Sequence, residues 1–320
     1  MDQLARRTLG DSAIEVPVVG IGCNNFGRRL DAEATERVVL AALEEGAGFF
    51  DTADVYGDGA SEEYLGRALN SRRDEAVVAT KFGWSTGSEE RSGGGSRRWI
   101  TLAVEDSLRR LGTDRIDLYQ HHRPDQATPL EETLGALNDL VIAGKVREIG
   151  CSNYSGAQIE EADAIARRNG WAHFVTAQNH YSLLERDEVE ATVTPACRRL
   201  GVGILPYFPL ANGLLTGKYR RGEQPPQGTR LAGNRGRAGE LMSDANFDVV
   251  EALERLAEER GVGSLDVAIG GLAAQPRVVS VIAGATSVEQ VRANARAGRW
   301  TPSAADLAEI DRITGRVAAA

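Results

Sequence analysis

Three side chains from different parts of the chain could move a proton together: those of Asp51, Tyr56 and Lys81. A lysine beside a carboxylate stays protonated, and its charge favours the phenolate form of a nearby tyrosine. The pKa of that tyrosine would then be lowered, so that it could donate a proton near neutral pH. Tyr56 follows Asp51 by five residues, in a turn that contains two glycines. The residue types therefore predict an acid–base site, provided that the fold brings them together.

His121 and His122 are consecutive. Side chains alternate along a strand, so only one of the two can face the interior, and the alternation leaves either choice open. Consecutive histidines are a poor pair of metal ligands, and neither His173 nor His180 has a ligand spacing with them. We therefore expect no metal site.

Short apolar runs alternate with longer amphipathic runs along nearly the whole chain, which is typical of βα units. The expected strands are Val18–Gly22, Phe49–Asp51, Ala76–Lys81, Asp117–His122, Val146–Ser152, Phe174–Asn179, Gly203–Tyr207 and Val278–Ala283. The expected helices between them include Ala32–Glu45, Ser61–Leu69, Arg97–Leu111, Pro129–Ala143, Ser155–Asn169, Glu188–Leu200, Asp248–Glu259 and Val288–Ala297. This pattern predicts the α/β class: one (β/α)8 TIM barrel domain over residues 1–320, with a long loop at Lys218–Asn246 after the seventh strand.

Polar residues stand at the carboxyl ends of several expected strands. They are Asp51, Lys81, His122, Ser152, Asn153 and Gln178. In a barrel these strand ends meet on one face, where active sites are built. We therefore expect residues far apart in the sequence to share one pocket.

Composition narrows the class of partner. Acidic residues outnumber basic ones by 46 to 37, for a net charge of −9. This balance argues against binding to nucleic acid or to an anionic membrane surface.

The first residues lack the apolar core of a signal peptide, and no run is long enough to span a membrane, so a cytoplasmic location is expected. Cys23, Cys151 and Cys197 are isolated and predict neither a disulfide framework nor a zinc site.

Two glycine motifs do not fit nucleotide-binding signatures. The segment GIGCNNFG begins like a Rossmann fingerprint, but its third glycine is misplaced. The segment GLLTGKY is one residue too short for a P-loop and has Tyr219 where a serine or threonine would bind the metal ion. Neither a Rossmann site nor a nucleoside triphosphate site is expected.

Seven segments together point to one family. They are FFDTADVYGDGASEEYLGRAL, VVATKFG, RIDLYQHHRPD, GKVREIGCSNYS, TAQNHYSLLER, LPYFPLANGLLTGKY and VIAGATSVEQVRAN. In these motifs and their order the chain resembles the aldo-keto reductases, which are (β/α)8 barrels that bind a nicotinamide dinucleotide without a Rossmann fold. The resemblance covers nearly the whole chain.

The resemblance implies the role of each candidate. Tyr56 would be the general acid, Lys81 and Asp51 would tune it, and His122 rather than His121 would orient the carbonyl group of a small-molecule substrate. Hydride would pass from C4 of the nicotinamide to the carbonyl carbon while Tyr56 protonates the oxygen, which gives an alcohol.

The resemblance also implies the cofactor contacts. Ser152, Asn153 and Gln178 would hold the carboxamide, and Tyr207 would stack on the nicotinamide. The pyrophosphate would be lined by Pro209, Leu210, Gly213, Lys218 and Arg230. The adenosine end would meet Gly284, Thr286, Gln290 and Asn294, and Gly22, Cys23 and Asp51 complete the expected set. NADP(H) is the expected cofactor and NAD(H) the alternative, with Arg292 as a candidate cation for the 2′-phosphate.

The chain departs from the family pattern at several positions. Phe208 replaces a small serine, GATS lacks the usual basic residue, and Ala293 replaces a glutamate that often approaches adenine. Gly270 and Gly271 interrupt the segment AIGGLAAQP, where the resemblance implies larger helix-forming residues, at a cost of about 1 kcal/mol each relative to alanine in a helix.

Two other functions compete with the reductase. Potassium-channel β subunits are relatives in this family that use the barrel to bind a channel protein. The resemblance implies that these subunits have an asparagine at the position of His122. A Schiff-base enzyme would use Lys81 as the nucleophile, whereas pairing with Asp51 should keep Lys81 protonated and a poor nucleophile. The reductase is therefore the favoured hypothesis.

Overall fold

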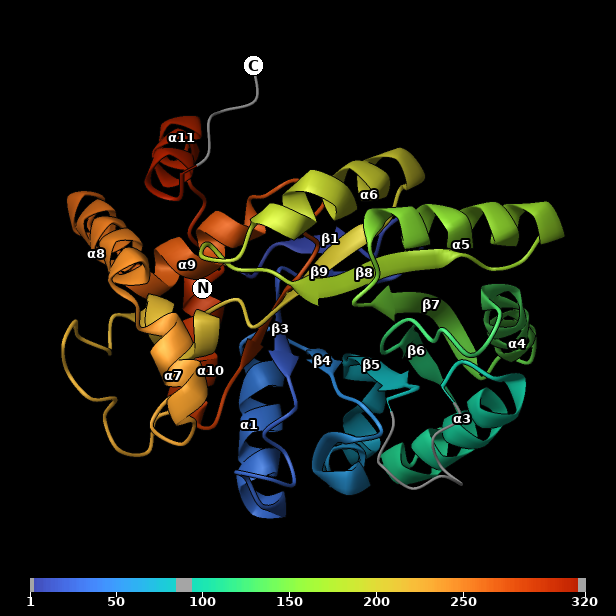
Figure 1. Ribbon diagram of the computed structural model, residues 1–320. Coiled ribbons are helices and arrows are strands. Elements are labelled where there is room, and N and C mark those ends of the chain that lie inside the picture. Colours follow the sequence, from blue (N-terminus) through green and yellow to red (C-terminus); the bar gives the residue numbers. More distant parts are fainter. Residues whose placement is uncertain (1–2, 85–93, 316–320) are drawn as a thin grey trace.

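The computed structural model describes residues 3–84 and 94–315, and its centre is a ring of parallel strands. In order around the ring, the strands are β10 (Val281–Gly284), β3 (Val19–Gly22), β4 (Phe49–Asp51), β5 (Val77–Phe82), β6 (Ile116–His121), β7 (Val146–Ser152), β8 (Phe174–His180) and β9 (Gly203–Tyr207). The ring closes where Ile204 of β9 bridges to Val278, and Val279 N donates to Ile204 O at 2.9 Å. The predicted (β/α)8 barrel is confirmed (Figure 1).

Helices surround the outside of the ring (Figure 1). Those that match expected helices are α1 (Ala32–Glu44), α2 (Ala60–Leu69), α3 (Arg97–Leu111), α4 (Leu130–Ile142), α5 (Gly156–Asn169), α6 (Thr194–Leu200), α8 (Asp244–Glu259) and α10 (Val288–Ala297). Their bounds follow local caps: Ser96 accepts from Trp99 N at the start of α3, and Gly112 ends that helix at φ +61°. The helix expected over Glu188–Leu200 is present as one continuous helical segment, in which a π-helical turn at Val189–Val193 leads into α6.

A hairpin that the sequence pattern did not predict covers one end of the barrel. Its strands, β1 (Arg6–Thr8) and β2 (Glu15–Pro17), pair antiparallel. Leu9 and Val16 are fully buried in one apolar cluster with Phe49 at the start of β4 and Val175 near the start of β8. The hairpin therefore closes the end opposite the carboxyl ends of the strands.

The long segment after β9 is ordered rather than structureless. It contains α7 (Arg235–Leu241) and the first turn of α8, which Ser243 caps. Tyr219, Leu231 and Leu241 are buried in a second apolar cluster with Phe247 of α8. This packing fixes the stretch against the barrel, so the expectation of a plain loop over Lys218–Asn246 is wrong for its second half.

Close helix packing explains the two glycines that had no assigned role. They lie in α9 (Ser264–Ala273), a helix beyond those expected, and both are buried. A Cβ atom on Gly270 would lie 2.7 Å from the backbone oxygen of Trp300, and one on Gly271 would lie 2.9 Å from Cδ1 of Ile310 in α11 (Ala304–Ile313). The glycines let α9 approach these segments, which offsets their low helix propensity.

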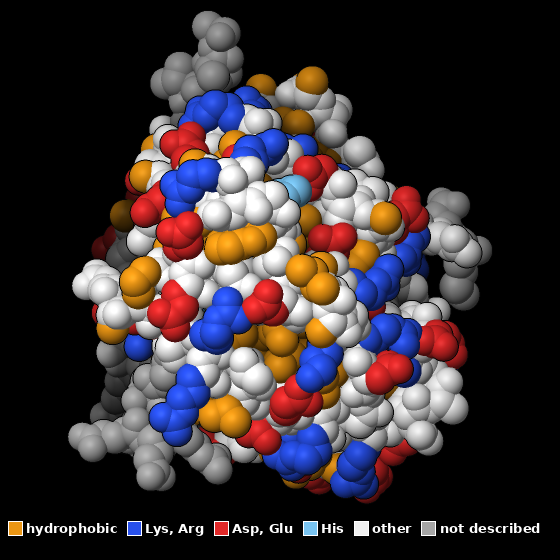
Figure 2. All heavy atoms as spheres, turned by 90° about the vertical axis from the view of Figure 1, so that its right-hand side faces the viewer, with side chains coloured by type: hydrophobic (Ala, Val, Ile, Leu, Met, Phe, Trp, Pro, Cys, Tyr) orange, Lys and Arg blue, Asp and Glu red, His pale blue; other side chains and the backbone are white. Residues whose placement is uncertain are grey.

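The outer face that carries α3, α4 and α5 has interspersed positive and negative side chains (Figure 2). Arg97 of α3 pairs with Asp139 of α4, and Arg168 of α5 pairs with Glu131 of α4. These ion pairs link neighbouring helices of the outer layer. Within residues 3–84 and 94–315, no helix combines the length and apolar character needed to cross a membrane.

Candidate active site

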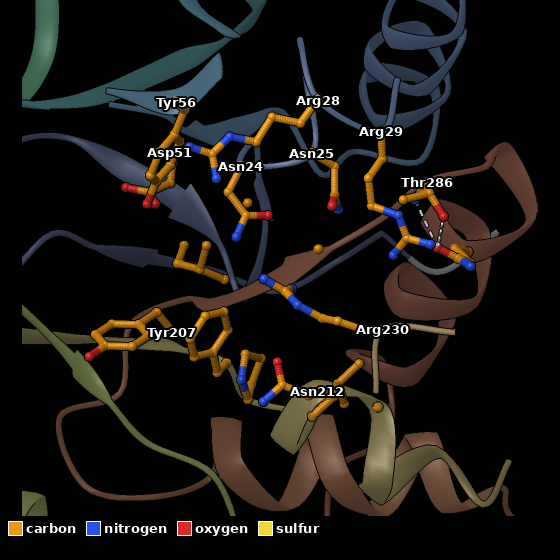
Figure 3. A pocket seen from close by; sticks show the side chains of 18 of the residues that line it. Asn24, Asn25, Arg28, Arg29, Asp51, Tyr56, Tyr207, Asn212, Arg230 and Thr286 are labelled. Atoms are coloured by element: carbon orange, nitrogen blue, oxygen red, sulfur yellow. Dashed lines mark hydrogen bonds between the residues drawn. The ribbon is translucent and has the colours of Figure 1, made fainter. Parts of the chain in front are cut away.

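A cavity of about 1210 Å³ opens at the carboxyl ends of the barrel strands (Figure 3). The predicted site residues that line it are Gly22, Asp51, Tyr56, His122, Ser152, Asn153, Gln178, Tyr207, Pro209, Leu210, Gly213, Lys218, Arg230, Gly284, Thr286, Gln290 and Asn294. Two predicted residues do not line it. Lys81 is buried beside Asp51, and Cys23 is buried with its N–H donating to Asp51 O at 2.9 Å. The expected shared pocket is present, but Cys23 does not face it.

Lys81 and Asp51 form a buried ion pair. Lys81 Nζ donates to Asp51 Oδ2 at 2.7 Å and to Thr52 O at 2.8 Å, and the lysine side chain is 0% exposed. The other oxygen of Asp51 accepts from Gln120 Nε2 at 3.1 Å and from Gln178 Nε2 at 2.9 Å. Burial lowers the pKa of Lys81, but Asp51 and Tyr56 raise it more, so the net pKa lies above the ordinary value. Lys81 therefore stays protonated.

Tyr56 lies against this pair, with its ring centroid 5.2 Å from Lys81 Nζ. Burial raises the pKa of the phenol, and the positive charge of Lys81 offsets only part of that rise. The net pKa of Tyr56 lies above its ordinary value, so the expectation of a lowered pKa is wrong for this structure. Tyr56 is accordingly a protonated donor at neutral pH.

The two histidines have different surroundings. His121 lies in β6, stacked on Phe82 with ring centroids 5.0 Å apart, and its Nδ1 is 2.8 Å from the hydroxyl oxygen of Tyr154. His122 follows β6, lines the cavity, and lies edge-on to Tyr56 with ring centroids 6.0 Å apart. Burial, with help from Lys81 and other nearby cations, lowers the pKa of His122 to about 2. The histidine that faces the cavity is therefore His122, and it is neutral at pH 7.

Asn153 connects three parts of the site. It follows β7 with φ +62°, in the left-handed region that asparagine enters more readily than most other non-glycine residues. Its Nδ2 donates to His122 O at 2.9 Å and to Ser152 Oγ at 3.1 Å. Its Oδ1 accepts from the hydroxyl of Tyr207 at 2.8 Å. The amide thereby ties the ends of β6, β7 and β9 into one wall of the cavity.

Phe208 forms the next part of the cavity wall, where the family pattern has a small serine. Its backbone has φ +52°, and the guanidinium of Arg230 lies 4.8 Å from the ring centroid. Lys218 approaches from the same long segment, and a Cβ on Gly213 would lie 2.5 Å from its Nζ. Burial and the charge of Arg29 lower the pKa values of both Lys218 and Arg230. The phenylalanine thus serves as a platform for a cation that points across the cavity.

The far end of the cavity is built on Gly284 and the start of α10. Gln290 Oε1 accepts from Thr286 N at 2.8 Å and from Thr286 Oγ1 at 3.1 Å, while Asn294 Nδ2 donates to Gly284 O at 3.5 Å. Arg292 points elsewhere: its Nε is 3.7 Å from Glu45 Oε1, and it does not line the cavity. The expectation that Arg292 serves this end is wrong because the helix turns it toward α1.

Several cavity residues were not predicted from the sequence. Asn24, Asn25, Arg28 and Arg29 come from the loop between β3 and α1, and Asn212 and Thr216 come from the segment after β9. The run NNFGRR stands directly after a strand end, and this placement is the signal that could have identified the first four. Trp84 also lines the cavity, with its ring 4.9 Å from that of His122.

Comparison with curated proteins gives relatives along almost the entire chain. The chain is 35% identical to a probable voltage-gated potassium channel subunit beta from Oryza sativa subsp. japonica, over 91% of this chain and 90% of the relative. It is 33% identical to an L-glyceraldehyde 3-phosphate reductase from Escherichia coli (strain K12), over 97% and 92%. It is 36% identical to a probable aldo-keto reductase 1 from Glycine max, over 94% and 86%.

The match to a family model extends across the barrel. The model of the aldo/keto reductase family matches residues 18–314, a range that contains every strand of the ring and every residue assigned above to the cavity. The resemblance drawn from the motifs is confirmed, and the family supports oxidoreductase activity. This chain belongs to the aldo/keto reductase family.

Proposed function

We propose that this protein reduces an aldehyde or a ketone to an alcohol, with NADPH or NADH as the reductant and Tyr56 as the proton donor. One observation carries the proposal. Tyr56 and His122 lie together at the cavity, and the buried Lys81–Asp51 pair lies beside the tyrosine. We also infer that residues 1–320 act as one barrel domain, in line with the family match over residues 18–314.

The side chains divide the proton chemistry among them. Tyr56 gives its proton to the carbonyl oxygen, and the ammonium of Lys81 stabilises the phenolate that remains. His122 is neutral and can donate a hydrogen bond to the same oxygen, which orients the carbonyl group. Asp51 holds Lys81 in place and keeps it charged. A bound reduced nicotinamide supplies the hydride that the carbonyl carbon accepts.

The donor groups around the cavity fit a nicotinamide dinucleotide. Hydroxyl and amide groups of Ser152, Asn153 and Gln178 gather near Tyr207 and suit a carboxamide and a flat ring. Lys218 and Arg230 suit a pyrophosphate, with Pro209, Leu210 and Gly213 beside them. Thr286, Gln290 and Asn294 suit the adenosine. We propose NADP(H) as the preferred cofactor and NAD(H) as the alternative.

A cofactor-binding regulatory subunit is the competing function, since some relatives are named as potassium channel β subunits. His122 favours the enzyme because an imidazole N–H at the cavity can hold a carbonyl oxygen. The Schiff-base alternative is disfavoured by the pairing of Lys81 with Asp51.

Turnover separates these functions. The purified protein would be mixed with NADPH or NADH and with sugars, aromatic aldehydes and ketones, and the loss of reduced cofactor would be followed by absorbance. We expect turnover with at least one carbonyl class, at a higher rate with NADPH. Tight cofactor binding with no turnover on any class would favour the regulatory subunit. Trapping of a lysine adduct by borohydride would favour the Schiff-base enzyme.

A further inference from the structure

Arg29 brings a positive charge into the cavity from the loop between β3 and α1. Its Nη2 donates to Gly228 O at 2.8 Å, which ties this loop to the long segment after β9. Figure 3 shows its guanidinium pointing toward Thr286, at the end of the cavity formed by the start of α10. Arg28, the preceding residue, points the other way, toward Tyr56. The side chains of these two neighbouring arginines therefore point toward opposite ends of one cavity.

Arg29 belongs to a cluster of uncompensated cations. Burial and the charge of Arg29 lower the pKa values of Lys218 and Arg230, so Arg29 repels both of these groups. Among the described residues, no carboxylate forms an ion pair with any of the three, whereas Arg292 and Arg299 on the outer side both pair with Glu45. Like charges held together without a counter-charge favour an anionic ligand. A pyrophosphate supplies a counter-charge for Lys218 and Arg230 but leaves Arg29, which points toward Thr286 (Figure 3), without one.

The neighbouring groups at that end are already engaged. Both the N–H and the hydroxyl of Thr286 donate to Gln290 Oε1, and Ser287 Oγ accepts from Gln290 N. Arg292 is turned toward Glu45. A guanidinium has five N–H donors, and Arg29 uses one of its terminal nitrogens on Gly228. Arg29 is thus the group at this end best able to form a two-pronged contact with a phosphate.

We propose that Arg29 binds the 2′-phosphate of NADPH, so that the cofactor preference of this chain is set by the loop between β3 and α1. This inference rests on the proposed function. It explains how the segment GATS can lack a basic residue while the cavity still distinguishes the two cofactors, because the cation comes from across the barrel mouth.

The test compares two single substitutions by fluorescence titration with NADPH and with NADH. Arg29→Gln should raise the Kd for NADPH about 10- to 100-fold and leave the Kd for NADH within about twofold. Arg292→Gln is the matched control, since it removes the same charge near the same helix but outside the cavity, and it should change neither Kd. Calorimetry with adenosine 2′,5′-bisphosphate and 5′-AMP should show the same selective loss in Arg29→Gln.

The other outcomes are distinct. An equal rise in both Kd values would overturn the proposal, since it would mean that Arg29 only ties the loop to Gly228. Unchanged Kd values, or a selective loss in Arg292→Gln instead, would also overturn it. If the unmodified protein bound neither cofactor, the proposed function itself would fail. An unchanged Kd for NADH also shows that the Arg29→Gln variant is folded.

Discussion

Lys81 Nζ lies 2.7 Å from Asp51 Oδ2, and the two side chains are 0% and 4% exposed to solvent. A buried ion pair contributes little net stability, because the cost of removing both charges from water offsets their attraction. Removing one partner is different, since it leaves an uncompensated charge in the interior. The pair is therefore a sensitive point for both folding and chemistry.

We predict that Lys81→Met lowers the free energy of unfolding by about 3–5 kcal/mol, because Asp51 is left buried and unpaired. Adding Asp51→Asn to that variant removes the charge and should restore part of the loss. Urea unfolding of both variants checks this. Equal stabilities of the single and the double variant would contradict the account of the pair.

In the same Lys81→Met variant, the pH profile of the residual reductase activity should have its alkaline limb shifted to higher pH. Lys81 lowers the pKa of Tyr56 in part, so its loss lets burial raise that pKa further. The measurement is the pH dependence of kcat/KM. Substantial activity with an unshifted profile would show that Lys81 does not tune Tyr56.

His121 should make the protein less stable in acid. Burial lowers its pKa to about 4, below the ordinary value of about 6.5, so the unfolded chain binds more protons between these values. The stabilisation that comes from this shift in the pKa of His121 is therefore fully present above pH 6.5 and is lost as the pH falls toward 4. When the pH is lowered from 7 to 5, the free energy of unfolding of His121→Gln should fall by about 2 kcal/mol less than that of the unmodified protein. Asp54, whose pKa is raised to about 7, has the opposite dependence and is present in both proteins.

Urea unfolding of the two proteins at pH 7 and pH 5 measures this difference. Gln keeps a polar group for Tyr154, so the comparison isolates the titration from the loss of a hydrogen bond. Identical losses of stability in the two proteins would mean that His121 does not bind protons preferentially in the unfolded chain.

Gly270→Ala should destabilise the protein by about 1–3 kcal/mol, although alanine is a better helix former by about 1 kcal/mol. The new methyl group would lie 2.7 Å from the backbone oxygen of Trp300, which cannot move without the chain. Gly271→Ala is the control, because its methyl group would meet only the ends of side chains, Cδ1 of Ile310 at 2.9 Å and Cδ1 of Leu183 at 3.7 Å. In thermal unfolding, the Tm of Gly270→Ala should be well below that of Gly271→Ala. The reverse order would contradict the packing argument.

The barrel could be predicted because each strand carries its own signal. The expected bounds of Phe49–Asp51, Val146–Ser152 and Gly203–Tyr207 agree with β4, β7 and β9. The hairpin of β1 and β2 was missed, since its strands, RRT and EVP, contain charged residues and form no apolar run. Its role is a tertiary contact that covers the barrel, which no local pattern records.

The site was predictable where residues stand at strand ends and not where loops cross the cavity. The sequence places Arg292 near the adenosine end, but the phase of α10 turns it toward Glu45, while Arg29 reaches that end from another loop. Strand alternation left the choice between His121 and His122 open, and the resemblance selected His122, which follows the end of β6. The pKa of Tyr56 could not be judged from the sequence, because burial outweighs the charge of Lys81 only once the pocket is formed.

If Tyr56 is the proton donor of a carbonyl reductase, Tyr56→Phe must lose most of the turnover. That change removes one hydroxyl and leaves the predicted dinucleotide contacts in place. The measurement is the rate of NADPH oxidation with the best carbonyl substrate, made beside a fluorescence titration of NADPH. We predict a loss of about 10²-fold or more in kcat with a nearly unchanged Kd. A near-normal kcat in Tyr56→Phe would contradict the account.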